Sequence, residues 1–336
     1  MKKLKSLLVL IIVGILSLSL VSCGKSESKT QESNEKLTIR ASYTTSPQYA
    51  VEIAIAEKKG FFDEAFKGKN VTVEYSTFGT GPAIMEAMSA GELDFAHGVG
   101  DQPTLSSIVN GSGGVIVART VLNEKGNGIF VDYDSNIKSV KDLKGKVIAV
   151  NLGSAGQKGL DLILEDNGLT EKDVQLINLK NMDEIFAAFE KNEIDAAVSA
   201  QMALNEKKAL DGKIARKLVD FTSHPNYAYL TVKSEFAKAH PEETQEFIDA
   251  LYKAGEWYNE NVEEGDKLVA AFLGADINDV VTANASSKIY LDFNDDDIQN
   301  IKDTYDFLKR NDLISKEVDD LSTTYDSKYI KNLKTK

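Results

Sequence analysis

The feature that most restricts the fold of this chain is a strand–helix unit that occurs twice. In the first half, a strand that ends at Tyr43 precedes a helix that ends at Gly60. In the second half, a strand that ends at Asn151 precedes a helix that ends at Gly168, and both separations are 17 positions. The matched spacing predicts two similar α/β substructures, each with helices packed on a sheet.

The two units also continue and close in the same way. Each adds a second strand and a second helix, within 71–90 and 174–191. The closing turn and strand read GELDFA at 91–96 and NEIDAA at 192–197. Because this period is too long for a solenoid, we predict two α/β domains. Chance similarity among ordinary βα units is the alternative.

Polar turns after strands suggest where a ligand binds. Within 76–105 we expect a strand, a glycine turn, a helix, a strand and a second polar turn at 98–104. Thr80 can cap a helix that begins at Gly81, with proline in its first turn. Both turns follow strands, so both should lie at the sheet edge where open α/β sheets bind ligands. A capped surface helix and an ordinary turn would give the same pattern.

Matching the two units pairs Ser46 with Ser154, each after the first strand of its unit. We expect each serine to cap a helix at the binding edge of its domain. Free N–H groups at Gly81 and at Ser154, Ala155 and Gly156 would then donate to an oxyanion between the domains. The Ser46, Thr80 and Ser154 hydroxyls would lie beside them.

The N-terminus predicts export and a lipid anchor. Three lysines precede an uncharged run, Leu7–Leu20, that is shorter than the roughly 20 residues of a membrane-spanning helix. We therefore expect a signal peptide at 1–22. The following Leu20–Cys23 resembles the lipobox of bacterial lipoproteins, which implies lipidation of Cys23. The polar stretch 23–36 should be a disordered tether between the lipid anchor and the folded body.

Length and charge limit the remaining possibilities. The net charge of −13 becomes −16 once the signal with its three lysines is removed, which argues against nucleic-acid binding. About 300 further residues suggest two domains. We expect the chain to cross between them twice, so that 37–120 plus 226–336 form lobe 1 and 121–225 form lobe 2.

Sequence motifs for catalysis or cofactors are missing. There is no GxxxxGK[ST] motif, and the three histidines are scattered without a second cysteine or an HExxH motif. We therefore predict no catalytic residue, no metal and no cofactor. His97 lies near the lobe 1 loops as a structural histidine, or as a ligand contact or base. Trp257 belongs to the core of an amphipathic helix or lines a pocket.

Two charged residues bear on the ligand. Arg119, which we place at the end of a strand, is the best candidate for a cation in the cleft, with a surface charge as the alternative. Asp101 would repel a bare anion. It therefore favours a zwitterion such as taurine, whose amine it could pair with, or it is a helix cap that points away.

Several segments together resemble the nitrate, sulfonate and taurine group of solute-binding proteins of ABC importers. They are the lipobox, 56–62, 79–88, 91–95, 139–150 with Gly153-Ser154, and 189–198. The resemblance implies a two-lobed type II periplasmic-binding-protein fold, α/β, with a mixed sheet flanked by helices in each lobe and a ligand cleft between the lobes. It also implies ligand contacts at Ser46, Gln48, Thr80, Gly81, Asp101, Gln102 and Ser154–Gly156. The sequence departs from many relatives at 199–202, where Gln201 replaces an aromatic-rich loop and is the candidate contact.

We therefore expect a monomeric, membrane-tethered receptor outside the membrane that passes a small oxyanion-bearing solute, such as a sulfonate, taurine or nitrate, to an ABC permease. One alternative is a heterocyclic solute, such as a thiamine-pyrimidine precursor, stacked on Tyr43, Tyr227 or Tyr229. A second alternative is a secreted hydrolase or pyrimidine synthase.

Overall fold

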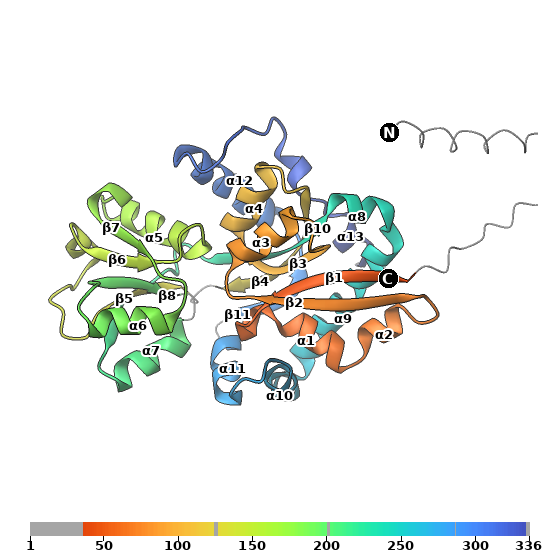
Figure 1. Cartoon of the computed structure of the whole chain (residues 1–336), viewed down its shortest axis with the longest axis horizontal. Coiled ribbons are helices and arrows are strands. Elements are labelled where there is room, and N and C mark those ends of the chain that lie inside the picture. The colour runs from red at the N-terminus through yellow and green to blue at the C-terminus, as the bar shows by residue number, and fades with distance from the viewer. Residues whose placement is uncertain (1–35, 124–126, 200–201, 286, 334–336) are drawn as a thin grey trace, which may run out of the picture. The chain divides into compact units, whose positions relative to one another are not determined.

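The computed structural model describes residues 36–123, 127–199, 202–285 and 287–333, and residues 36–336 form one compact unit (Figure 1). Two separate β-sheets organise this unit. The first sheet has the strand order β11-β4-β10-β3-β1-β2, and the second has the order β7-β6-β8-β5-β9. The predicted α/β class with two mixed sheets is confirmed.

The first sheet takes its strands from both ends of the folded chain, and the second from the middle. The first sheet contains β1 (Leu37–Thr44), β2 (Val71–Phe78), β3 (Phe95–Gly100), β4 (Gly114–Asn123), β10 (Asn226–Lys233) and β11 (Ser287–Asp292). The second contains β5 (Gly128–Asp132), β6 (Val147–Val150), β7 (Gln175–Asn178), β8 (Ala196–Ser199) and β9 (Ala215–Asp220). The chain therefore passes between the sheets twice, after β4 and after β9.

Helices flank both sheets. Those near the first sheet are α1 (Val51–Lys58), α2 (Phe61–Ala65), α3 (Gly81–Ser89), α4 (Asp101–Val109), α8 (Ser234–Ala239), α9 (Pro241–Glu260), α10 (Val262–Leu273), α11 (Ile277–Asn284), α12 (Asp295–Arg310) and α13 (Lys328–Leu333). Those near the second are α5 (Ala155–Asp166), α6 (Met182–Glu190) and α7 (Met202–Asp211). Short 3₁₀ turns are η1 (Pro47–Tyr49), η2 (Val140–Leu143), η3 (Glu171–Asp173) and η4 (Leu321–Thr324).

The second sheet shows how strand alternation builds its core. Along β5, Ile129 and Val131 belong to an apolar cluster that includes residues of α5, whereas Phe130 packs into a cluster that includes Ile185 and Phe189 of α6. Successive strand side chains point to opposite faces of a sheet. The buried sheet therefore needs apolar residues at every position, which explains why this strand shows no polar alternation.

The two sheets have matching topology, so the predicted internal repeat is confirmed. In each, the first strand of the unit lies between two parallel neighbours, and an antiparallel strand follows. The closing turns match in detail. Gly91 and Asn192 both have positive φ, 80° and 57°. In each turn the next N–H donates back to a helix carbonyl, at 3.0 Å from Glu92 and 2.9 Å from Glu193, as in a Schellman cap.

Two local predictions were wrong. The stretch 98–104 is not a polar turn, because β3 continues to Gly100 and α4 begins at Asp101. Pro103 is tolerated in the first helical turn, and burial of Leu105 and Val109 stabilises the helix. Arg119 does not end a strand, since β4 continues to Asn123.

Candidate functional site

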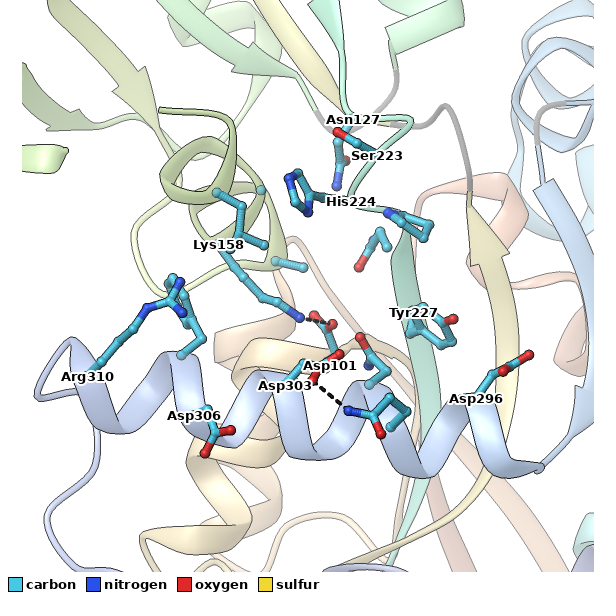
Figure 2. A pocket seen from close by; sticks show the side chains of 18 residues that line it. Asp101, Asn127, Lys158, Ser223, His224, Tyr227, Asp296, Asp303, Asp306 and Arg310 are labelled. Carbon is cyan, nitrogen blue, oxygen red and sulfur yellow. Dashed lines mark hydrogen bonds and ion pairs between the residues drawn. The ribbon is translucent and has the colours of Figure 1, made fainter. Parts of the chain in front are cut away.

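A cavity of about 500 Å³ lies where α12, α5 and the return segment 223–227 approach one another (Figure 2). Asp101 at the start of α4 and Ala155 at the start of α5, both predicted site residues, line it. The remaining lining comes chiefly from α12 and from the two crossings: Asn127, Ser223, His224, Pro225, Asn226, Tyr227, Asp296, Gln299, Asn300, Asp303, Asp306, Phe307 and Arg310. The cavity thus borders both sheets.

A buried ion pair crosses this cavity. Lys158 of α5 places Nζ 2.6 Å from Asp101 Oδ2 (Figure 2). The same Nζ lies 2.6 Å from the Thr304 hydroxyl of α12. The Lys158 backbone N–H donates to Gln102 Oε1 at 3.1 Å. Asp101, Gln102 and Lys158 are all buried. Asp101 therefore already has a cation, and Gln102 faces α5.

Four buried carboxamides gather beside the cavity, and we name them the carboxamide cluster: Gln48, Asn123, Asn127 and Asn226. Asn127 and Asn226 line the cavity, and Asn226 pairs in register with Asn123 across β10 and β4. Asn226 Nδ2 donates to the Tyr49 hydroxyl at 2.9 Å. Burial raises the pKa of Tyr49, while nearby Asn123, Asn226 and Gln48 oppose the rise. Tyr49 is therefore a neutral hydroxyl.

The carboxamide cluster has unused hydrogen-bonding capacity. Gln48 Oε1, both Asn123 amide atoms, Asn127 Oδ1 and Asn226 Oδ1 have no hydrogen-bond partner among the described residues. The exposed fractions are 1% for Gln48, 2% for Asn123, 4% for Asn127 and 9% for Asn226. Each unmet buried polar group costs about 1–3 kcal/mol. Four of these five atoms are oxygens, which accept hydrogen bonds, and only Asn123 Nδ2 can donate, so the set is suited chiefly to N–H or O–H groups of a polar guest.

Two helix N-termini predicted to meet do lie close together. Thr80 Oγ1 accepts from the Ala83 N–H of α3, and Ser154 Oγ accepts from the Gln157 N–H of α5, both at 3.4 Å. A Cβ built on Gly153 would lie 3.9 Å from Pro82 at the start of α3. Both predicted caps are confirmed, and Gly81, Ala155 and Gly156 occupy the first turns of these helices.

The predicted cap at Ser46 was wrong. Ser46 precedes η1, but its hydroxyl makes no capping bond within the described part of the chain. The Tyr49 N–H, which a capping hydroxyl would accept, donates instead to the Ser46 carbonyl at 3.0 Å. The 3₁₀ turn instead brings Gln48 and Tyr49 into the core.

Arg119 is held by carboxylates rather than left free. Its Nη1 lies 2.7 Å from Asp297 Oδ1 in α12, and its Nη2 is 3.6 Å from Asp292. The Tyr290 hydroxyl is 3.1 Å from the same Nη2. Burial lowers the pKa of Arg119, but Asp297, Tyr290 and Asp292 outweigh it, so the pKa is raised. Its role as ligand cation stays a prediction.

The other candidate residues are placed as follows. The Tyr43 ring packs at 5.0 Å from Phe272 of α10, and Tyr229 is fully buried, whereas Tyr227 lines the cavity. Trp257 packs against the core of the first sheet, with Lys59 over its ring. Gln201 and Cys23 lie outside the described residues.

His97 contacts the backbone of Tyr49, next to the carboxamide cluster. Its Nδ1 lies 3.1 Å from the carbonyl oxygen of Tyr49, and its Nε2 is 3.5 Å from buried Glu52 of α1. A Cβ built on Gly98 would lie 2.6 Å from the same carbonyl. Strand β3 and η1 are therefore in close contact, which fixes Tyr49.

Four residues of the site were not predicted from the sequence: Asn123, Asn127, Asn226 and Lys158. The three asparagines lie within or beside the segments predicted as crossings, so carboxamides at crossings were the available signal. Lys158 gave none, because a lysine in an amphipathic helix is ordinarily solvated. Among the described residues, no cluster of three or more His, Cys, Asp or Glu could hold a metal. No helix in that part of the chain is long and apolar enough to cross a membrane.

Two mixed sheets of matching order, joined by two crossings, give this protein the periplasmic-binding-protein fold. The chain belongs to the NMT1/THI5-like family, whose model matches residues 48–264. A Bacillus subtilis (strain 168) protein named for binding aliphatic sulfonates is 31% identical over 336 residues, which cover 97% of this chain and 96% of that protein.

Solved structures agree on the fold. The alkanesulfonate-binding protein SsuA from Xanthomonas axonopodis pv. citri, bound to MOPS, superimposes with a TM-score of 0.73 at 22% identity, over 87% of this chain and 99% of that one. The desulfurization enzyme DSZB superimposes with a TM-score of 0.68 at 20% identity, over 89% and 99%. At these identities the likeness shows the fold alone.

Proposed function

We propose that this protein is the extracytoplasmic receptor of an ABC importer and captures a small sulfonate-bearing solute. The observation that carries the proposal is the pair of neighbouring helix N-termini, at Gly81 of α3 and at Ala155–Gly156 of α5, of which Ala155 lines the cavity. The chain is similar to a sulfonates-binding protein along nearly its whole length. A sulfonate spreads one charge over three oxygens, so neutral N–H and O–H donors can hold it without a free cation.

Ligand contacts follow from this proposal. Asn123 and Asn226 amides, the Tyr49 hydroxyl and N–H groups of α3 and α5 would donate to the sulfonate oxygens. Removing one such donor leaves its partner oxygen unmet, which costs about 1–3 kcal/mol, or roughly 5- to 150-fold in affinity. Closure of the two lobes predicted at 37–120 plus 226–336 and at 121–225 would provide the signal that the permease recognises.

Calorimetric titration tests the proposal. Full-length protein should bind an alkanesulfonate, and Asn226→Ala should weaken that binding within the range above. Asn284→Ala is the matched control, since this buried carboxamide in α11 donates to Asp266 at 2.7 Å and is outside the cavity lining described here. Absence of binding across sulfonates, taurine and nitrate would reject the proposal. Equal losses of affinity in the two variants would mean that the solute does not bind at Asn226.

A second candidate ligand is a heterocycle such as a thiamine-pyrimidine precursor. The observation in its favour is Tyr227, whose ring lines the cavity and stacks with Tyr229 at 6.4 Å between centroids. An aromatic face of this kind suits a planar guest. Including such a precursor in the same titration separates the two ligands.

We also propose that the protein is not an enzyme. The relative that the chain matches along nearly its whole length is named as a binding protein. The similarity to DSZB is one of fold. Incubation with each bound solute should return it unchanged by mass spectrometry. Turnover of any of them would overturn this part of the proposal.

The anchor and the assembly complete the proposal. Cys23 would carry the lipid that tethers a monomeric receptor to the outer side of the cell membrane, next to its permease. Cys23→Ser should abolish lipid labelling and leave precursor or shed protein, with solute affinity unchanged. Normal labelling of the variant would refute the lipidation, and a dimer in native mass spectrometry would refute the monomer.

A further inference from the structure

Asp101 raises a difficulty for any site that takes an anion. Asp101 is 3% exposed and lines the same cavity as Asn127 and Asn226. A buried carboxylate beside a sulfonate would repel it strongly, because little water remains to screen the two charges. Either the ligand brings its own cation, as an aminosulfonate does, or the protein supplies one.

The protein itself supplies a cation for Asp101. Lys158 Nζ donates to Asp101 Oδ2 and to the Thr304 hydroxyl, both at 2.6 Å. The Asp101 Oδ1 atom accepts the Gln102 N–H at 2.7 Å. Both carboxylate oxygens are therefore engaged, and the pair as a whole is neutral. An incoming ammonium group would have to share the Asp101 oxygens with Lys158 and would be repelled by the Lys158 charge.

We propose that Lys158 is a built-in counter-cation that selects sulfonates without an ammonium group. This inference rests on the proposed function. Lys158 is then a specificity-determining residue, since it occupies the position on Asp101 that the amine of an aminosulfonate would need. The ligand class is the simple aliphatic sulfonates, and aminosulfonates such as taurine are discriminated against.

The other carboxylates of the cavity do not replace Asp101 as amine partners. Asp296, Asp303 and Asp306 of α12 line the same cavity (Figure 2), but all three are exposed to solvent. Asp303 Oδ1 also accepts from Gln299 Nε2 at 2.8 Å. Exposed carboxylates attract a cation only weakly because water screens them.

The same pair links the two sheets. Lys158 belongs to α5 beside the second sheet, while Asp101 and Thr304 belong to α4 and α12 beside the first. The Lys158 backbone N–H adds a bond to Gln102 Oε1 at 3.1 Å. A ligand ammonium that displaced Lys158 from Asp101 would therefore also break one of these two bonds between α5 and α4, which adds to the selection against it.

Calorimetry with ethanesulfonate and taurine on the full-length protein, purified in detergent, tests the inference. The two ligands differ by one ammonium group. Unmodified protein should bind ethanesulfonate at least about 30-fold more tightly than taurine. Equal affinities, or tighter taurine binding, would overturn the inference while the receptor function stands. No binding of either sulfonate would instead reject the proposed function.

Variants of Lys158 and Asp101 test whether this ion pair causes the preference for ethanesulfonate over taurine. Lys158→Met frees Asp101, so the affinity for ethanesulfonate should fall at least about 10-fold and the preference should shift toward taurine. In the double variant with Asp101→Asn, which removes both charges, the ethanesulfonate preference should return. Lys253→Met is the matched control, because it removes the ion pair of another lysine, to Glu64 at 2.6 Å, outside the cavity lining. An equal shift of preference in this control would refute the assignment to Lys158.

Discussion

Replacing Arg119 by methionine would show whether this arginine holds the fold or the ligand. Its guanidinium is buried and lies 2.7 Å from Asp297, whose side chain is fully buried. Removing one partner of a buried pair leaves the other charge uncompensated, which costs about 3–5 kcal/mol. We expect Arg119→Met to lower the free energy of unfolding by that amount at pH 8, and solute affinity to change less than threefold, about 0.7 kcal/mol.

The loss in the free energy of unfolding caused by Arg119→Met should depend on pH. Burial raises the pKa of Asp297 to about 6, and Arg119 opposes the rise. Without Arg119 the pKa of Asp297 rises further. A raised carboxyl pKa means that the folded state holds the proton more tightly, so its stabilising effect is present at low pH and lost as pH rises through that pKa. The variant should therefore lose less stability at pH 5 than at pH 8.

Urea unfolding at the two pH values measures this deficit. Asp297→Asn provides the second side of a double-mutant cycle, and the double variant should lose less than the sum of the single losses. A different outcome would refute the reasoning: an unchanged urea midpoint for Arg119→Met together with a loss of solute affinity of about 30-fold or more. Arg119 would then be a ligand cation.

Three further predictions concern stability and the shape of the site. Burial and a nearby glutamate raise the pKa of Asp161 to about 9, so stability should decline between pH 5 and 8 by at most about 1.4 kcal/mol per pH unit. Asp161→Asn should flatten that decline in thermal melts, and an unaltered slope would contradict the assignment. Gly98→Ala, at φ 69°, should destabilise by more than about 1 kcal/mol and weaken solute binding. Gly79→Ala is its control, as a Cβ there meets no described atom within 4 Å, and equal losses would exclude the steric cause. Thr80→Ala and Ser154→Ala should each lose about 1 kcal/mol in urea unfolding, and no loss would mean that these caps contribute nothing.

The architecture was readable from the sequence because it depends on local patterns. Strand and helix lengths, the helix ends at Gly60 and Gly168, and the matched closing turns all rest on residues close together in the chain. Thr80 and Ser154 were predictable as caps for the same reason, since a cap needs only the next three residues. Repetition of the unit then predicted the second sheet from the first.

The partners of the charged residues were not readable in this way. Arg119 meets Asp297 from an element 178 positions later, and Asp101 meets Lys158 57 positions later. Nothing local indicates which carboxylate a buried cation will reach. The missing cap at Ser46 has a local cause, because η1 is a single 3₁₀ turn in which the Tyr49 N–H donates to the Ser46 carbonyl.

The pairing of Asn123 with Asn226, and of Gly128 with Asp220, has a mechanical consequence. The chain leaves the first sheet and returns to it at neighbouring positions, so the second sheet is an insertion in what would otherwise be an antiparallel hairpin of β4 and β10. Because both crossings leave the first sheet at paired positions and reach the second at paired positions, they lie on one side of each sheet. We expect the inserted sheet to turn about this pair of crossings, with little change in its distance from the first sheet.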